Sequence, residues 1–296
     1  NADIDRLLDS IGDTEYWADP LIPAATITQV VGYNGHGKSF FLQALLTSMA
    51  AGKEQFGPYE TKPAKILYLD YDNPARTILY RFKNFVRMFG DPTDNFNMWS
   101  PSLISQEDGG EMILSTEAGF SLLGEWLDAI KPQIVVIDTI RNAFGGLEEA
   151  SASEWFKVNH VAKSIRNKYG ASVVMVHHRN KPGEAGLGRE AGSTAQLTDI
   201  DTQIMVTQVF QKKGDAKAKA GLFDVELEVV DGAGKVWTPF GFLEQRLRPD
   251  SRLRMVSQIS FGKVRQTTEL HETHYVGWAE SLIDGSQYVV STSSMK

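Results

Sequence analysis

The chain has 296 residues, of which 42% are hydrophobic and 23% are charged, and its net charge at neutral pH is −7. These values are typical of a globular protein and exclude a surface that coats nucleic acid by positive charge on every side. The absence of cysteine excludes disulfides and thiolate metal sites. Because no run of eighteen apolar residues occurs, we expect no membrane partner and a cytoplasmic location.

Strands are expected where apolar and β-branched residues run together, and helices where apolar residues recur at helical spacing. After a short amphipathic helix at 3–11, the two kinds of element alternate as far as residue 180. The expected strands are 25–31, 65–70, 96–99, 133–138 and 171–177, and the expected helices are 40–51, 74–89, 116–130 and 151–169. This alternation predicts an α/β fold, with a mostly parallel sheet flanked by helices on both faces.

The last third of the chain has a different pattern. Strands are expected at 202–210, 222–230 and 235–238, and a Gly-rich turn would pair the last two as a hairpin. They predict an antiparallel extension of the sheet, and helices become hard to find after residue 248. The expected parts of the chain are an N-terminal linker helix in 1–20, a main domain in 21–248 and a C-terminal extension in 249–296 that is mostly β or irregular.

Residues 32–39 match the phosphate-binding pattern G-x-x-x-x-G-K-[ST]. An apolar strand precedes them and a helix without Pro or Gly follows, which is the setting that the pattern requires. The glycines let the main chain approach a di- or triphosphate, Lys38 would reach its β- and γ-phosphates, and Ser39 would hold Mg²⁺. The residues predicted to contact the nucleotide are Gly32, Asn34, Gly35, His36, Gly37, Lys38, Ser39 and Phe40.

Acidic residues end two of the expected strands. Asp138 closes the most hydrophobic one, where a carboxylate would hold Mg²⁺ through water; its alternative role is a turn acid or helix cap. Asp70 and Asp72 end the second strand, and ligands of parallel sheets lie beyond the carboxyl ends of strands. We predict that Asp72 activates the attacking water, against the alternative that these acids cap the helix that Pro74 begins.

Two histidines come at the end of the strand 171–177. His177 or His178 would touch the γ-phosphate or the attacking water, or else simply pack against the protein. The Gly- and charge-rich segment after them reads either as a plain surface loop or as a nucleic-acid loop without aromatic stacking residues. In the second case the residues predicted to contact DNA are Arg179, Lys181 and Arg189.

A further basic run follows the strand 202–210. Lys212 and Lys213 would reach the nucleotide of a neighbouring subunit and stabilise transition-state charge, as an arginine finger does. The alternative is a solvated hairpin tip.

Four segments, taken in their order, resemble the RecA-like ATPases. They are the phosphate loop 32–39, the segment 68–74 with the sequence YLDYDNP, the segment 134–141 with the sequence IVVIDTIR, and the segment 177–181 with the sequence HHRNK. The similarity covers about 15–245 and is greatest to the hexameric replicative helicases typified by plasmid RepA and related to DnaB.

This resemblance implies a Mg²⁺-dependent ATPase that forms a ring, expected to be hexameric, around single-stranded DNA. It assigns the catalytic base to Asp72, where the family usually has Glu, the sensor to His178 and the cations acting on a neighbour's site to Lys212 and Lys213. Three rivals stay open: a recombinase or repair ATPase that forms filaments on DNA, a RecA-fold signalling ATPase independent of nucleic acid, and a nucleotide-binding module that hydrolyses nothing.

Overall fold

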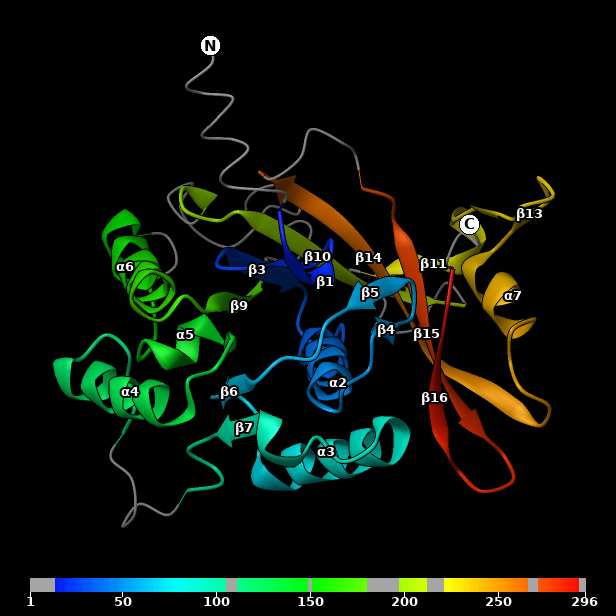
Figure 1. Cartoon of the computed structure of the whole chain (residues 1–296). Coiled ribbons are helices and arrows are strands. Elements are labelled where there is room, and N and C mark those ends of the chain that lie inside the picture. The colour runs from blue at the N-terminus through cyan, green and yellow to red at the C-terminus, as the bar shows by residue number, and fades with distance from the viewer. Residues whose placement is uncertain are drawn as a thin grey trace, which may run out of the picture.

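The computed structural model describes residues 14–104, 111–148, 151–179, 197–211, 221–265 and 271–292 (Figure 1). The linker helix expected at 3–11 lies outside these residues, so it stays a prediction.

A ten-stranded sheet forms the centre of the molecule, in the order β16-β15-β14-β10-β3-β9-β8-β6-β7, with β11 beside the end of β10 (Figure 1). The strands from β10 to β7 along this order are parallel, and β14, β15 and β16 continue the sheet antiparallel. The parallel strands are β3 (Ile27–Gly32), β6 (Ile66–Asp70), β7 (Phe96–Trp99), β8 (Ile134–Asp138), β9 (Ser172–His178), β10 (Thr202–Phe210) and β11 (Leu222–Phe223). The antiparallel strands are β14 (Ser251–Val264), β15 (His274–Ser281) and β16 (Gln287–Ser291).

The helices form two layers because the inner parallel strands are apolar on both faces. On one face, α2 (Lys38–Ala50) and α3 (Ala75–Phe89) share an apolar core with the sheet. On the other, α4 (Glu117–Ile130), α5 (Ile140–Ala143) and α6 (Ala152–Tyr169) share a second core. Figure 1 shows α2 and α3 in blue and cyan, apart from the green group of α4, α5 and α6.

Smaller elements cover the margins of the sheet. A four-stranded sheet joins β1 (Tyr16–Asp19), β2 (Ile22–Pro23), β4 (Gln55–Phe56) and β5 (Tyr59–Thr61), and its aromatic side chains pack against α2. A third apolar cluster lies under α7 (Pro239–Glu244), against β14, β15 and β16. In the described part of the chain, no helix combines the length and the apolar character needed to cross a membrane.

The fold class predicted from the sequence is confirmed, and most element bounds agree within two residues. Helix ends follow capping chemistry: Thr116 and Ser151 cap α4 and α6 through their hydroxyls, and Gly170 ends α6 with a φ of 68°. The hairpin expected across 231–234 is present as β12 (Val229–Val230) and β13 (Val236–Trp237), but it forms a separate two-stranded sheet. The expectation that 202–238 supplies the antiparallel extension is wrong, because β10 and β11 pair in parallel and the antiparallel strands are β14, β15 and β16. The continuous strand expected at 222–230 is wrong, because a short 3₁₀ helix, Asp224–Glu226, interrupts it.

The C-terminal extension belongs to the central sheet. β14 pairs with β10 along most of its length, so that 251–291 adds three strands directly to the parallel part. The proposed boundary at 248 therefore falls between strands of one continuous sheet, and the division into domains stays a prediction.

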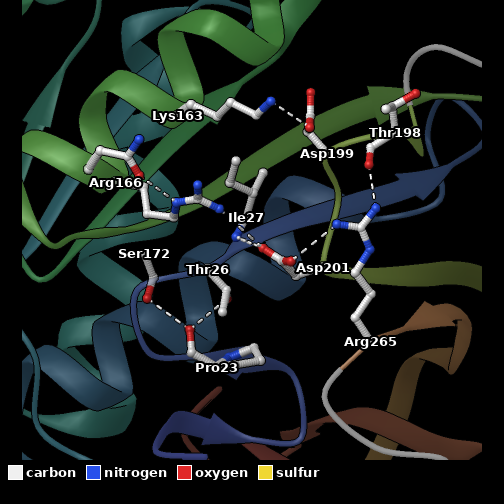
Figure 2. A network of polar contacts seen from close by, with 11 residues as sticks. Pro23, Thr26, Ile27, Lys163, Arg166, Ser172, Thr198, Asp199, Asp201 and Arg265 are labelled. Carbon is white, nitrogen blue, oxygen red and sulfur yellow. Dashed lines mark hydrogen bonds and ion pairs between the residues drawn. The ribbon is translucent and has the colours of Figure 1, made fainter. Parts of the chain in front are cut away.

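A network of polar contacts fastens the edge of the sheet at which β3, β9 and β10 begin (Figure 2). The Asp201 carboxylate accepts a hydrogen bond from the main-chain N–H of Ile27 at 2.9 Å and lies within 3.9 Å of Arg166 and 3.7 Å of Arg265. Nearby, Lys163 forms an ion pair with Asp199 at 2.6 Å. Strands far apart in the sequence thus share one partly buried anchor, Asp201, at the sheet edge opposite the carboxyl ends.

Candidate functional site

The carboxyl ends of four neighbouring parallel strands bring the predicted residues together. β3 ends at Gly32, β6 at Asp70, β8 at Asp138 and β9 at His178. Asp70 lies directly opposite Asp138 in the register, and Gly32 opposite His178. Parallel pairing therefore places motifs separated by about a hundred residues at one edge, where ligands of such sheets bind.

The phosphate loop has the backbone that its glycines permit. Gly35 and Gly37 have φ values of 80° and 81°, a left-handed conformation, and Gly37 is the residue from which α2 starts. A Cβ at Gly32 would come within 2.3 Å of the carbonyl oxygen of Val206 in β10, so only glycine fits. α2 begins directly after the loop that follows β3, and the first N–H groups of a helix have no intrahelical partner, which is the arrangement that binds phosphate.

His36 fixes the loop rather than offering its ring to a ligand. Its side chain is buried, and Nδ1 accepts a hydrogen bond from the main-chain N–H of Gln208 in β10 at 3.2 Å. The ring also packs edge-on against Tyr33 and Phe210. Burial, with the charge of Lys38, lowers the pKa of His36 to about 4, so the imidazole is neutral at pH 7. Only its backbone remains for the predicted phosphate contact.

Lys38 lies at the centre of the site and is almost completely buried. Its Nζ donates to the carbonyls of Gly32 and Tyr33 at 3.0 Å each and lies 3.0 Å from Nδ1 of His178. Burial lowers the pKa of Lys38 to about 8, against the opposing charges of Asp138 and Asp72. The ammonium is thus still protonated at pH 7 and beside the phosphate loop.

Asp138 is fully buried and is held by an unforeseen partner, Tyr68. The Tyr68 hydroxyl donates to Oδ2 at 2.6 Å, whereas the buried Oδ1 has no hydrogen-bond partner among the described residues. Burial raises the pKa of Asp138 to about 6; the hydrogen bond from Tyr68 opposes this rise and the charge of Asp70 adds to it, while the Ser39 hydroxyl and Lys38 favour the ionised form. Tyr68 lies two residues before Asp70 on the same strand, so the two side chains are on the same face of the sheet. This spacing was the sequence signal that could have placed Tyr68 near the site.

The structure separates the two acids that follow β6. Asp70 is buried and accepts from the main-chain N–H groups of Asp72 and Asn73, and from the side chains of Asn73 and Gln43. It therefore builds the turn. Asp72 is exposed toward the cavity, and its Oδ1 accepts from the amide of Asn142 at 3.0 Å. The alternative that one of these residues caps α3 is wrong, since Pro74 occupies the cap position without a side-chain bond.

The two histidines of β9 face opposite sides. His177 is buried against the Trp155 ring of α6, with centroids 5.1 Å apart, and His178 contacts Lys38 in the site. Burial, with the charge of Lys38, lowers the pKa of His178 to about 4. Because Lys38 is the donor in their contact, the neutral ring of His178 accepts at Nδ1 and carries its proton on Nε2. Of the two candidates, only His178 is positioned to touch a phosphate or a water there.

The basic candidates are only partly described. Arg179 follows His178, and its guanidinium lies over the ring of Tyr33 at 5.8 Å and 3.5 Å from the sulfur of Met205. Lys181, Arg189, Lys212 and Lys213 lie outside the described residues, so their roles in DNA binding and in a neighbour's site stay predictions.

Of the residues described above, Lys38, Asp72 and His178 line a cavity of about 350 Å³. The phosphate loop and the turn after β6 form one side, with Asn34, Ser39, Phe40 and Asp72 among the lining residues. Sequence reasoning missed the other side, which comes from Arg81 of α3 and from β14, β15 and β16. The only signal in the local sequence is a basic cluster of ambiguous role, which consists of Arg246, Arg248, Arg252 and Arg254.

The residues fit a nucleoside triphosphate and Mg²⁺. Ser39 and the unpartnered Oδ1 of Asp138 are oxygen donors, as Mg²⁺ prefers, and they stand where a strand and the phosphate loop end. In the described part of the chain no group of three or more His, Asp or Glu side chains is placed to hold a metal by itself.

Comparison with known proteins identifies the family of the chain and a similar fold. A family model described as "AAA domain" matches residues 2–184, more than half of the sequence and including the whole P-loop, Asp72 and Asp138. The chain belongs to this AAA domain family. A solved KaiC-like protein from the hyperthermophilic archaeon Pyrococcus horikoshii is similar in fold, with a TM-score of 0.50, 13% identity and coverage of 92% of this chain and 94% of that one. No curated protein sequence matches. Family and fold together support a RecA-like P-loop ATPase, while the helicase branch is a finer assignment.

Proposed function

We propose that this AAA domain protein is a Mg²⁺-dependent ATPase that acts as a ring-forming replicative DNA helicase on single-stranded DNA. The observation that carries the proposal is that Lys38, Asp72 and His178 line one cavity at the carboxyl edge of the sheet, where the buried Asp138 carboxylate also ends β8. Each has the chemistry that phosphoryl transfer to water requires: a phosphate-binding cation, a metal-site carboxylate, a base and a sensor.

The roles follow from the geometry of the residues. Lys38 and the N–H groups at the start of α2 bind the phosphates, and Ser39 with Asp138 holds Mg²⁺, which when bound neutralises charge on the β- and γ-phosphates. Asp72, oriented by Asn142 at 3.0 Å, accepts a proton from the attacking water. The resemblance to replicative helicases, where Glu is usual at this position, supports the role.

The path from hydrolysis to DNA starts at His178. This ring contacts Lys38 on one side, and the next residue, Arg179, begins the segment that we predict to contact DNA. Loss of the γ-phosphate would alter the contacts of Lys38 and His178. Because His178 ends β9 and Arg179 follows it, the end of β9 would transmit this change to the segment that we predict to contact DNA. The net charge of −7 is compatible with a basic channel inside an acidic ring.

The test is the ATPase rate with and without single-stranded DNA, measured with the oligomer size in solution. We expect a ring whose hydrolysis is stimulated by single-stranded DNA, and unwinding of a forked duplex. Lys38→Ala is the control and should remove hydrolysis. DNA-independent hydrolysis by a monomer would refute the helicase and leave the ATPase intact; open filaments that pair strands without unwinding would favour the recombinase. No hydrolysis by the wild type would refute both.

A further inference from the structure

The C-terminal strands build part of the wall of the cavity. Arg254 and Met255 of β14, Trp278 and Ala279 of β15 and Gln287 of β16 line it. These residues come more than 200 positions after the phosphate loop and lie beyond the segment that the family model matches. The antiparallel strands of a subunit thus form part of the wall of that subunit's own nucleotide site.

A β-bulge sets which side chains reach the cavity. Leu253 pairs with Ala279 and Met255 pairs with Trp278, so Arg254 is an extra residue without an opposite partner. Leu253 packs in the apolar cluster under α7, whereas Met255 packs in the cluster that contains α2. Regular alternation would put residues 253 and 255 on the same face; the bulge instead turns Arg254 and Met255 together toward the cavity.

Two contacts hold the bulge against the start of α2. The Met255 methyl carbon lies 3.3 Å from the position that a Cβ on Gly37 would take. The Trp278 ring packs edge-on against Phe40, with centroids 4.7 Å apart. Gly37 and Phe40 flank the two residues, Lys38 and Ser39, that we assign to phosphate and metal. Arg254 is therefore displayed next to the polyphosphate end of the site.

Among the described residues, the positive charge of the arginines at the bulge is only partly neutralised. Arg254 donates from Nε at 2.6 Å and from Nη2 at 2.5 Å to Oε2 of Glu280. Arg252 donates to the same oxygen from Nη2 at 3.1 Å and Nε at 3.3 Å. One carboxylate therefore serves two guanidiniums, which leaves one positive charge and free donors on a side chain that is 50% exposed.

We propose that Arg254 is a nucleotide-binding residue that contacts the phosphates of ATP bound in its own subunit, with Glu280 holding its guanidinium in place. The planar fork of guanidinium donors matches phosphate oxygens, and Arg252, which shares Glu280 but does not line the cavity, supplies no such contact. The inference rests on the proposed function only in requiring ATP in the phosphate loop; it needs neither DNA nor a ring.

The experiment is a titration of full-length protein with fluorescent ATP, ADP and AMP analogues in the presence of Mg²⁺. Arg254→Gln should weaken ATP binding by about 10- to 100-fold, the range for a lost hydrogen bond to a charged group. The loss should be smaller for AMP, because the contact is to the polyphosphate. Arg254→Lys should recover part of the affinity, since the charge remains but the fork is lost.

The matched control is Arg252→Gln, which changes the same residue type on the same strand and the same Glu280 partner. Its ATP affinity should stay within about twofold of the wild type, and thermal melting of both variants verifies the fold. Equal losses of ATP affinity in the two variants would overturn the inference, and so would a normal ATP affinity in folded Arg254→Gln. In either case, ATP binding by the wild type would still support the phosphate site. Wild-type protein that binds no ATP analogue would overturn the proposed function as well.

Discussion

Asp138→Asn should stabilise the ligand-free protein and remove its Mg²⁺-dependent hydrolysis. The carboxylate is fully buried, and burial raises its pKa from an ordinary 3.8 to about 6. This rise corresponds to about 3 kcal/mol of folding free energy lost when the group ionises in the folded protein. Asparagine has no charge to desolvate and its carbonyl can still accept from the Tyr68 hydroxyl.

The stabilisation expected from Asp138→Asn is smaller than the full free-energy penalty of the buried, ionised carboxylate. The asparagine amide would face the position of the unpartnered Oδ1, and an unsatisfied buried donor costs about 1–3 kcal/mol. The net expectation is a stabilisation of up to about 2 kcal/mol at pH 7, which urea unfolding can measure. Hydrolysis should fall to background, because an amide is a poor substitute for the carboxylate at the metal.

The pH dependence gives the sharper test. Below about pH 4 the carboxyl is protonated in both states and carries no penalty. Between pH 4 and 6 the unfolded chain ionises first, so wild-type stability falls as pH rises, and above pH 6 the penalty is complete. The advantage of Asp138→Asn should therefore vanish or reverse toward pH 4. Tyr68→Phe is the control and should destabilise more at pH 7 than at pH 4. An Asp138→Asn protein that is less stable at pH 7, or that still hydrolyses ATP, would refute this reasoning.

Three further predictions concern single side chains. Asp72→Ala should keep ATP binding and lose at least about 100-fold in hydrolysis rate, which paired titration and phosphate-release assays separate; loss of binding would contradict its role toward water. ATP affinity of the free protein should decline as pH rises through about 8, where the buried Lys38 loses its proton, and Lys38→Arg should flatten that decline. Asp201→Ala should lower the free energy of unfolding by about 1–3 kcal/mol, because the main-chain N–H of the buried Ile27 loses its acceptor. Asp199→Ala, which removes only an ion pair, should cost less than about 1 kcal/mol. Equal effects of the two substitutions in urea unfolding would argue against the anchor.

The sequence alone determined the phosphate end of the site. The loop 32–39 is a local motif whose chemistry lies in its own backbone and in two adjacent side chains, so its strand and helix context sufficed to recognise it. The alternation of strands and helices predicted a parallel sheet, and parallel strands end at a common edge. That rule placed Asp138 and the acids after β6 near the loop before any distance was known.

Only the tertiary structure decided between neighbouring candidates. His177 and His178 must face opposite sides of β9, yet which side carries the nucleotide depends on how α6 packs against the sheet. Asp70 and Asp72 differ in role because one is buried under its own turn and the other is exposed to the cavity. The wall from β14, β15 and β16 depends on the pairing of β14 with β10, on the packing of these strands against the phosphate loop more than 200 residues earlier, and on one bulge at Arg254. Such long-range contacts leave no local pattern in the chain, because they arise only when the strands have been brought side by side.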